Sequence, residues 1–292
     1  MATGDLVTED YGLEYRGFAF GGSTSDFLLA PGSIGFADLP GVATADRQRL
    51  RRHGLHPGDD FMLGRQILIP IEVTADDTAT WETNLGALRE AFRVDPDRGE
   101  DPLVFQIPGI AGGGKRRINC RPRGLAVPVD LDWFYEIVVV TVRLEATSPY
   151  LLDDSETTVI SSLLTAGSSG LTWPLTWPLN WGTVESSSFT LTNNGTQAAD
   201  FCATIPGPVT NPKIVDVGTG RELEFTIALA SGEFLEVDTG ARTVLLNGTA
   251  SRYSTIAAGS EWFTLAPGSN ELSYRADSGS SNLSITFRST WS

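Results

Sequence analysis

The segment RQILIPIEVT, residues 65–74, decides the fold of the first half of the chain. Its residues alternate, and every second position from Ile67 to Val73 is isoleucine or valine. A period of two predicts a β-strand that buries one face. Pro70 has no backbone N–H to donate to a neighbouring strand, so we expect a sheet edge or a bulge at this residue.

One helix is expected directly after this strand. Apolar residues recur there at helical spacing, namely Trp81, Leu85, Leu88 and Phe92. Asp76 and Asp77 precede them, where acidic side chains favour the start of a helix, and Pro96 follows them. Further strands are expected at residues 13–18, 26–29, 102–108, 115–121 and 133–146. The first half is therefore predicted to be an α+β domain, a sheet or split barrel packed by one helix.

The second half alternates apolar and polar residues almost throughout. The expected strands lie at residues 189–192, 201–205, 223–227, 235–237, 244–246, 271–274 and 283–287. Turn sequences such as Asn193-Asn-Gly195 and Asn247-Gly248 separate them. Seven or more short strands at this spacing predict a β-sandwich, because each sheet must bury one face against another. The fold class is thus mainly β.

The alternation stops between the two halves. Residues 153–184 are rich in Ser, Thr and Gly, and from Leu171 to Gly182 they repeat the pattern Leu-Thr-Trp-Pro. Proline at every fourth residue excludes a helix and favours an extended path. We therefore predict three parts: a domain at residues 1–152, a linker at residues 153–184 and a β-sandwich domain at residues 185–292.

The linker repeat contains Trp173, Trp177 and Trp181. The favoured interpretation is that their indoles pack against the protein's own domains, because a large exposed aromatic surface is unfavourable. The alternative is an aromatic platform for a sugar or a partner protein, to which Trp262 would contribute.

The balance of charge limits the classes of partner. The chain has a formal net charge of −15. Residues 1–150 carry 15 basic and 22 acidic residues and the remainder carries 6 and 14, so both halves are acidic. Because phosphate binding needs a basic face, nucleic acid and an anionic membrane are not expected as the main partner. Without a secretory signal or an apolar stretch long enough to span a membrane, we expect a soluble protein made in a cytoplasm.

Catalytic chemistry has little support in the sequence. His53 and His56, the only histidines, share a segment with glycine and proline, and a metal site needs at least a third ligand. Cys120 and Cys202 fall in different halves and lack the spacing of a disulfide framework or a metal site. No nucleophile elbow, Walker loop or dinucleotide fingerprint is present. We predict no catalytic residues, no cofactor and no metal, and hence a protein that is not an enzyme.

Two basic clusters contrast with the acidic background. They comprise Arg47, Arg49, Arg51 and Arg52 in the first cluster, and Lys115, Arg116, Arg117, Arg121 and Arg123 in the second. One interpretation is a solvated loop and a hairpin edge whose charge prevents aggregation. The other is an interface at which guanidinium groups meet acidic faces of a neighbouring copy of the chain. The sequence gives the two equal weight.

Ordered motifs in the second half resemble the C-terminal domain of the distal tail proteins of siphophages. These motifs are Asn194-Gly195 and the segments 205–214, 232–239, 242–248 and 262–272, the last with the pattern Leu-x-Pro-Gly-x-Asn. The first half resembles the same family's N-terminal domain. Its motifs are Gly64-Arg65 before the alternating strand, a helix with Leu85 and Leu88, the segment Phe105 to Gly109, and Ala146 to Tyr150. Ser148 stands where the family usually has aspartate.

This resemblance spans nearly the whole chain and implies an architecture. The N-terminal domains would form a homohexameric ring, with α+β split-barrel-like subunits, next to the tail tube. The C-terminal domains would be galectin-like β-sandwiches that project outward. Such a ring would be a structural protein of the virion tail tip, or baseplate, and would join the tail tube to tail-tip and receptor-binding proteins. The high ratio of arginine to lysine is typical of a high-GC host such as an actinobacterium.

Two other functions remain open at this point. The main alternative is a carbohydrate-binding β-sandwich protein or an enzyme accessory module, with Trp173, Trp177, Trp181 and Trp262 as platforms for a host surface carbohydrate or other sugar. The other is the equivalent hub of a tail-like particle without a genome. The sequence does not distinguish that particle from a phage.

Overall fold

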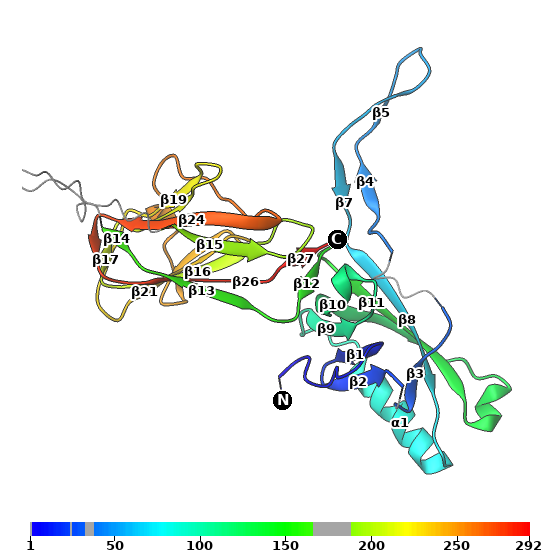
Figure 1. Ribbon diagram of the computed structural model, residues 1–292. Helices are drawn as coiled ribbons and strands as arrows, with labels where there is room; N and C mark the ends of the chain where they lie inside the picture. Colours follow the sequence, from blue (N-terminus) through cyan, green and yellow to red (C-terminus); the bar gives the residue numbers. More distant parts are fainter. Residues whose placement is uncertain (1, 24, 33–37, 166–187) are drawn as a thin grey trace, which may run out of the picture. The chain divides into compact units, whose positions relative to one another are not determined.

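The computed structural model describes residues 2–23, 25–32, 38–165 and 188–292 (Figure 1). The chain divides into two compact units. The first comprises Met1–Asp154 together with Trp291–Ser292, and the second comprises Ser155–Thr290. Each unit has its own hydrophobic core.

A nine-stranded sheet forms the first unit. Its strands are β1 (Gly12–Tyr15), β2 (Phe18–Gly21), β3 (Phe27–Leu29), β8 (Arg65–Val73), β9 (Asp101–Gln106), β10 (Lys115–Ala126), β11 (Val138–Ala146), β12 (Leu151–Asp153) and β27 (Thr290–Trp291). Their order is β2-β1-β9-β10-β11-β8-β3, and β12 pairs with both β10 and β27. The end strands β2 and β3 contact each other, so the sheet is a nearly closed barrel. This arrangement confirms the predicted split-barrel-like sheet.

Strands β8 and β11 are paired in register over nine residues, from Arg65 opposite Ala146 to Val73 opposite Val138. The alternating isoleucines and valines of β8 are fully buried, as the period of two predicted. On its other side, β8 pairs with β3 only from Ile71 to Val73. The strand therefore becomes a sheet edge at Pro70, where an edge or a bulge was expected.

The predicted helix is α1 (Thr78–Ala91). Asp77 caps its N-terminus, because the Asp77 carboxylate accepts hydrogen bonds from the Thr80 N–H at 3.0 Å and the Thr80 hydroxyl at 2.7 Å. The helix buries Trp81, Leu85 and Leu88 in the first core. Short 3₁₀ turns are η1 (Ala111–Gly113), η2 (Asp132–Tyr135) and, in the second unit, η3 (Tyr253–Thr255).

The strand expected at residues 133–146 is shorter than predicted. Strand β11 begins at Val138, and the residues from Asp132 to Tyr135 form the 3₁₀ turn η2 instead. Glu136 ends this turn in the left-handed region, with φ of 60°, so the backbone cannot continue as a strand there. The aromatic residues in this segment raise β-propensity without showing where the turn lies.

The second unit is a β-sandwich, as predicted. A six-stranded sheet has the order β13-β26-β16-β21-β22-β23, a second sheet has the order β14-β24-β18-β19 with β15 paired to β24, and a small sheet has the order β20-β17-β25. The strands are β13 (Thr157–Ser161), β14 (Leu164–Thr165), β15 (Ser188–Asn193), β16 (Phe201–Pro206), β17 (Val209–Thr210), β18 (Lys213–Asp216), β19 (Glu222–Glu224), β20 (Ala228–Leu229), β21 (Phe234–Asp238), β22 (Thr243–Leu246), β23 (Ala250–Ser251), β24 (Gly268–Ala276), β25 (Ser278–Gly279) and β26 (Leu283–Phe287). All seven segments expected to contain a strand do so.

Strand structure also lies inside residues 153–184, which the sequence predicts to be a linker. Strand β13 is the edge of the six-stranded sheet, with its five residues paired to β26. Four of its five residues, in the sequence Thr-Thr-Val-Ile-Ser, are β-branched, and Val159 packs against the second core. At the other end of the predicted sandwich, Trp291 belongs to the first unit. The repeat with Trp173, Trp177 and Trp181 lies outside the described residues.

We expect β13 to be required for a stable sandwich. A fragment that begins at Ser155 should therefore melt at a temperature higher by at least about 10 °C than a fragment that begins at Glu185, because the shorter one loses a paired strand that covers the core. Thermal unfolding followed by circular dichroism compares the two. Equal melting temperatures would mean that the sandwich is independent of β13.

Candidate functional site

A long β-hairpin, here called the arm, comprises residues 41–64 of the first unit and extends away from it at the start of β8 (Figure 1). Strand β4 (Val42–Thr44) pairs with β7 (Asp60–Met62), and β5 (Arg47–Gln48) pairs with β6 (Leu55–His56). Between the two pairs, the Gly58 N–H donates to the Asp46 carboxylate at 2.9 Å. Every residue of the arm is exposed.

Many of the exposed side chains of the arm are apolar. These are Val42, Leu50, Leu55, Phe61, Met62 and Leu63, with Leu39 just before the arm. Leu50 is 94% exposed and Phe61 is 67% exposed. An isolated two-stranded hairpin is marginally stable in water, and contiguous exposed apolar surface marks interaction sites. The arm therefore has the properties of a segment that is covered by a partner.

The tip of the arm carries the first basic cluster. Residues 47–56 contain four arginines and no acidic residue. In the part of the chain that the structure describes, Arg47, Arg49, Arg51 and Arg52 make no ion pair. Their positive charge is therefore available to a partner, as the interface interpretation requires.

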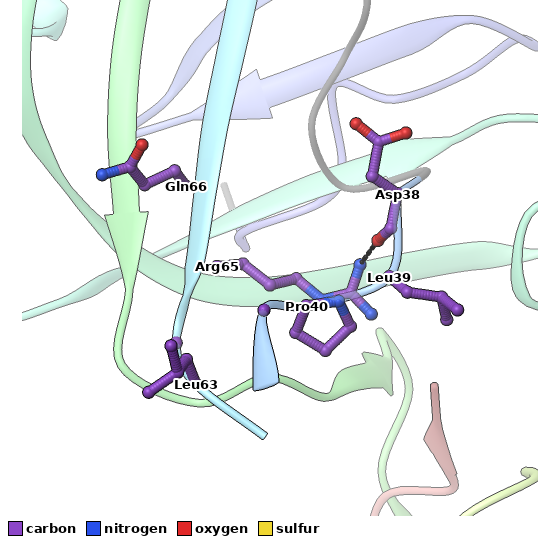
Figure 2. A pocket seen from close by; sticks show the side chains of 8 residues that line it. Asp38, Leu39, Pro40, Leu63, Arg65 and Gln66 are labelled. Carbon is purple, nitrogen blue, oxygen red and sulfur yellow. Dashed lines mark hydrogen bonds between the residues drawn. The ribbon is translucent and has the colours of Figure 1, made fainter. Parts of the chain in front are cut away.

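Arg65 fixes the root of the arm. Its side chain is buried, and its Nε donates to the Pro149 carbonyl at 2.6 Å while its Nη1 donates to the Asp38 carbonyl at 2.7 Å. Burial lowers the pKa of the guanidinium, and the nearby Asp38 carboxylate opposes this shift. Figure 2 shows Arg65 pointing into a cleft of about 390 Å³ that is lined by residues 38–41 and 63–66.

The second basic cluster lies on β10, and most of its side chains have partners inside the first unit. Arg116 forms an ion pair with Asp153 at 2.9 Å, and its guanidinium lies 4.5 Å from the centre of the Trp291 ring. Trp291 Nε1 donates to the same Asp153 carboxylate at 2.8 Å. Arg117 forms an ion pair with Asp154 at 2.5 Å. This part of the cluster secures β12 and the last residues of the chain.

The remaining members of this cluster differ in whether they have a partner among the described residues. Lys115 Nζ donates to the Gly4 carbonyl at 3.0 Å, and Arg123 forms an ion pair with Glu145. Arg121 Nε is buried and has no hydrogen-bond partner among the described residues. The two basic clusters are thus not equivalent, since the arm presents its charge outward and β10 uses most of its charge internally.

The candidate aromatic platform is only partly described. Trp262 is half-buried, packs against the second core and lies 6.4 Å from the Tyr253 ring, with an angle of 23° between the rings. Tyr253 is 53% exposed. Trp173, Trp177 and Trp181 lie outside the described residues.

His53 and His56 lie on the exposed arm. No group of three or more His, Cys, Asp or Glu residues that could hold a metal ion occurs in the described ranges. Among these same residues, no helix has the length and apolarity needed to cross a membrane.

Sequence reasoning missed a second exposed surface, the loop at residues 127–137 between β10 and β11. It exposes Val129, Leu131, Phe134 and Tyr135, and it contains three acidic residues and no basic one. The sequence pattern that could have identified this loop is Val-Asp-Leu-Asp, residues 129–132, in which apolar and acidic residues alternate just before the aromatic residues. The β-prone residues that follow led to its assignment as the start of a strand.

Comparison with known proteins gives a consistent result. Residues 182–291 match the sequence model of the family described as "Siphovirus-type tail component, C-terminal domain". A search of the curated proteins finds no match. Over 96% of this chain and 98% of the other, the structure is similar to the crystal structure of the Dit protein (gp 19.1) of phage SPP1, with 14% identity and a TM-score of 0.66. That protein is described as a paradigm of the hub adsorption apparatus in phages that infect Gram-positive bacteria.

A second similarity concerns the baseplate of phage P2 in its activated conformation with Ca. It covers 93% of each chain, with 8% identity and a TM-score of 0.50. The same baseplate in its activated conformation with Sr also has a TM-score of 0.50, with 8% identity, over 95% of this chain and 96% of the other. Most of the second unit thus matches a family by sequence, and the two units together have a Dit-like fold.

Arg65 is expected to be important for stability. In the Arg65→Met variant the carbonyls of Asp38 and Pro149 lose a charged donor, so the free energy of unfolding should fall by at least about 2 kcal/mol. Chemical denaturation measures this change. Arg143→Met on the neighbouring strand β11 is the matched control, because Arg143 is exposed and should change stability by less than about 0.5 kcal/mol. Similar effects of the two substitutions would contradict the role given to Arg65.

Proposed function

We propose that the protein is the distal tail protein of a long-tailed bacteriophage, a ring-shaped hub in the virion tail tip. The observation that carries the proposal is the agreement of two comparisons. Residues 182–291 match a family of siphovirus-type tail components, and the fold of both units follows that of the SPP1 hub protein over nearly the full length of both chains. The hub would join the tail tube to tail-tip and receptor-binding proteins.

The first unit is proposed to build the ring, most simply as a homohexamer. Two different surfaces on each subunit are needed for a ring that closes by rotation. The arm supports this role because its apolar and basic side chains are exposed together. Of the two candidate interface clusters, the arm arginines fit an interface better than the basic residues of β10, most of which pair within the unit.

We propose a structural role and no catalytic one. The matched family and the similar structures are tail and baseplate components. His53 and His56 project on the arm, where no packed environment positions them for acid–base chemistry. The mechanism would be geometric: the ring continues the tube, and its periphery provides docking surfaces. A high-GC host remains a prediction from the ratio of arginine to lysine.

Carbohydrate binding by the sandwich is the second candidate function. The observation that favours it is the Trp262–Tyr253 ring pair. Trp262 is half-buried in the second core, so mainly Tyr253 would be available to stack on a sugar. The support for carbohydrate binding is therefore weaker than the support for the hub function. The two functions are compatible when the sandwich of the hub also contacts the host surface.

The proposed ring has a defined mass. Six copies of 31.3 kDa give 6 × 31.3, or about 188 kDa. We expect a species of this mass by mass photometry as concentration is raised, because association of the exposed arms is concentration-dependent. Antibody labelling should place the protein at the tail tip. A monomer at every concentration, together with a monomer on isolated tail tubes, would contradict the proposal.

A further inference from the structure

The loop at residues 127–137, here called the acidic knob, combines the same two properties as the arm with the opposite charge. Its exposed apolar side chains are Val129 at 75%, Leu131 at 74%, Phe134 at 81% and Tyr135 at 64%. Its charged side chains are Asp130, Asp132 and Glu136, and it has no lysine or arginine. Exposed aromatic residues beside charges are typical of protein interfaces.

Contacts with α1 hold the acidic knob in place. Trp133 packs against the first core and meets the Trp81 ring edge-on, with 4.8 Å between the ring centres. The Thr78 hydroxyl donates to the Glu136 carboxylate. These contacts fix the base of the loop, so the exposure of its apolar residues belongs to an anchored surface.

The arm and the acidic knob are complementary in charge and in apolar surface. Residues 47–56 carry four arginines without an acid, and residues 127–137 carry three acids without a base. Arginine guanidinium groups pair with carboxylates and also stack on aromatic rings, so the knob offers both kinds of partner. Charge complementarity sets the register of an interface, and the apolar residues on both sides supply water-excluding contact.

The two surfaces cannot meet within one copy. The arm joins β8 at Arg65, and the acidic knob joins β11 at Val138. Because Val138 pairs with Val73 and Ala146 pairs with Arg65, the two attachments lie at opposite ends of a nine-residue strand pair (Figure 1). Nine residues of antiparallel strand span roughly 30 Å. Contact between the arm and the knob therefore requires two molecules.

We propose that the arm of one copy docks onto the acidic knob of the next copy. This inference rests on the proposed ring and identifies its subunit contact. The two faces are different patches of the same chain, so each subunit uses its arm toward one neighbour and its knob toward the other. Repetition of this contact by rotation closes a ring.

Charge reversal tests the contact. The arm variant carries Arg47→Glu, Arg49→Glu and Arg52→Glu, and the knob variant carries Asp130→Arg and Asp132→Arg. In each variant alone the two faces have the same sign, so the concentration at which half of the protein is assembled should rise at least about tenfold. Mixing the two variants restores opposite charges at every contact if they alternate around a ring of even number, and assembly should return to within about threefold of the unchanged protein.

If mixing the two variants restores assembly, misfolding is excluded as the cause of the lost assembly in each variant alone. A matched control carries Glu82→Arg and Asp97→Arg, which are exposed acids of the same unit outside both surfaces. This control changes net charge by the same amount as the knob variant, and it should shift assembly by less than about threefold. Mass photometry measures the unchanged protein, the two variants, their mixture and the control.

Disulfide trapping gives a second readout. Leu50→Cys in the arm and Leu131→Cys in the acidic knob should yield chains linked head to tail after oxidation with diamide, whereas Leu50→Cys with Val94→Cys should not. The native thiols compete poorly, because Cys120 is buried and burial raises the pKa of the Cys202 thiol to about 11. Product chains of two to six copies would identify the contact directly.

The outcomes separate the contact from the ring. If the unchanged protein forms no ring in solution or on tail tubes, the proposed function and this contact are both wrong. If it forms a ring that charge reversal of the knob leaves unchanged, and the Leu50→Cys and Leu131→Cys pair gives no product, the ring stands and the contact is wrong. Capture of a different tail protein by the arm cysteine would likewise overturn the contact between copies.

Discussion

The first unit depends on the nine-residue pairing of β8 with β11. This pairing buries the isoleucine and valine faces of both strands and continues the sheet toward β10 on one side and β3 on the other. Its full register also determines what lies at each end of the strand pair. The arm extends from the end of Arg65, and the acidic knob extends from the end of Val138. One backbone ladder thus builds the core and separates the two exposed surfaces.

The two basic clusters differ in whether their arginines have acidic partners within the first unit. On β10, Arg116 and Arg117 are half-buried and neutralise the adjacent Asp153 and Asp154. The arginines of the arm are exposed and form no ion pair among the described residues. In a chain with a net charge of −15, copies repel each other unless a local positive surface offsets the excess. In the proposed ring the arm supplies this surface, and its exposed apolar residues are covered by the neighbouring copy.

Most of the fold could be predicted from local pattern, and the candidate site only in part. The alternation of residues 65–74 and the helical spacing from Trp81 to Phe92 identified β8 and α1, because each pattern reports directly on a buried face. The β-branched strand β13 was missed, since its Ser- and Thr-rich surroundings resemble a linker. The contact of Arg116 with Trp291 joins residues far apart in the chain, and local pattern carries no information on it. The arm arginines were recognised as a cluster, but their presentation on a hairpin without buried residues required the structure.

Hydrogen–deuterium exchange of the arm in dilute and assembled protein tests the account most directly. In the dilute monomer, amides of the arm such as that of Leu63, which donates to the Gly41 carbonyl, should exchange rapidly because no core covers them. On assembly, residues 41–64 and residues 127–137 should become protected together, while β8 and β11 are protected in both states. An arm that is already protected in the monomer, or that stays unprotected in the assembled ring, would contradict the account.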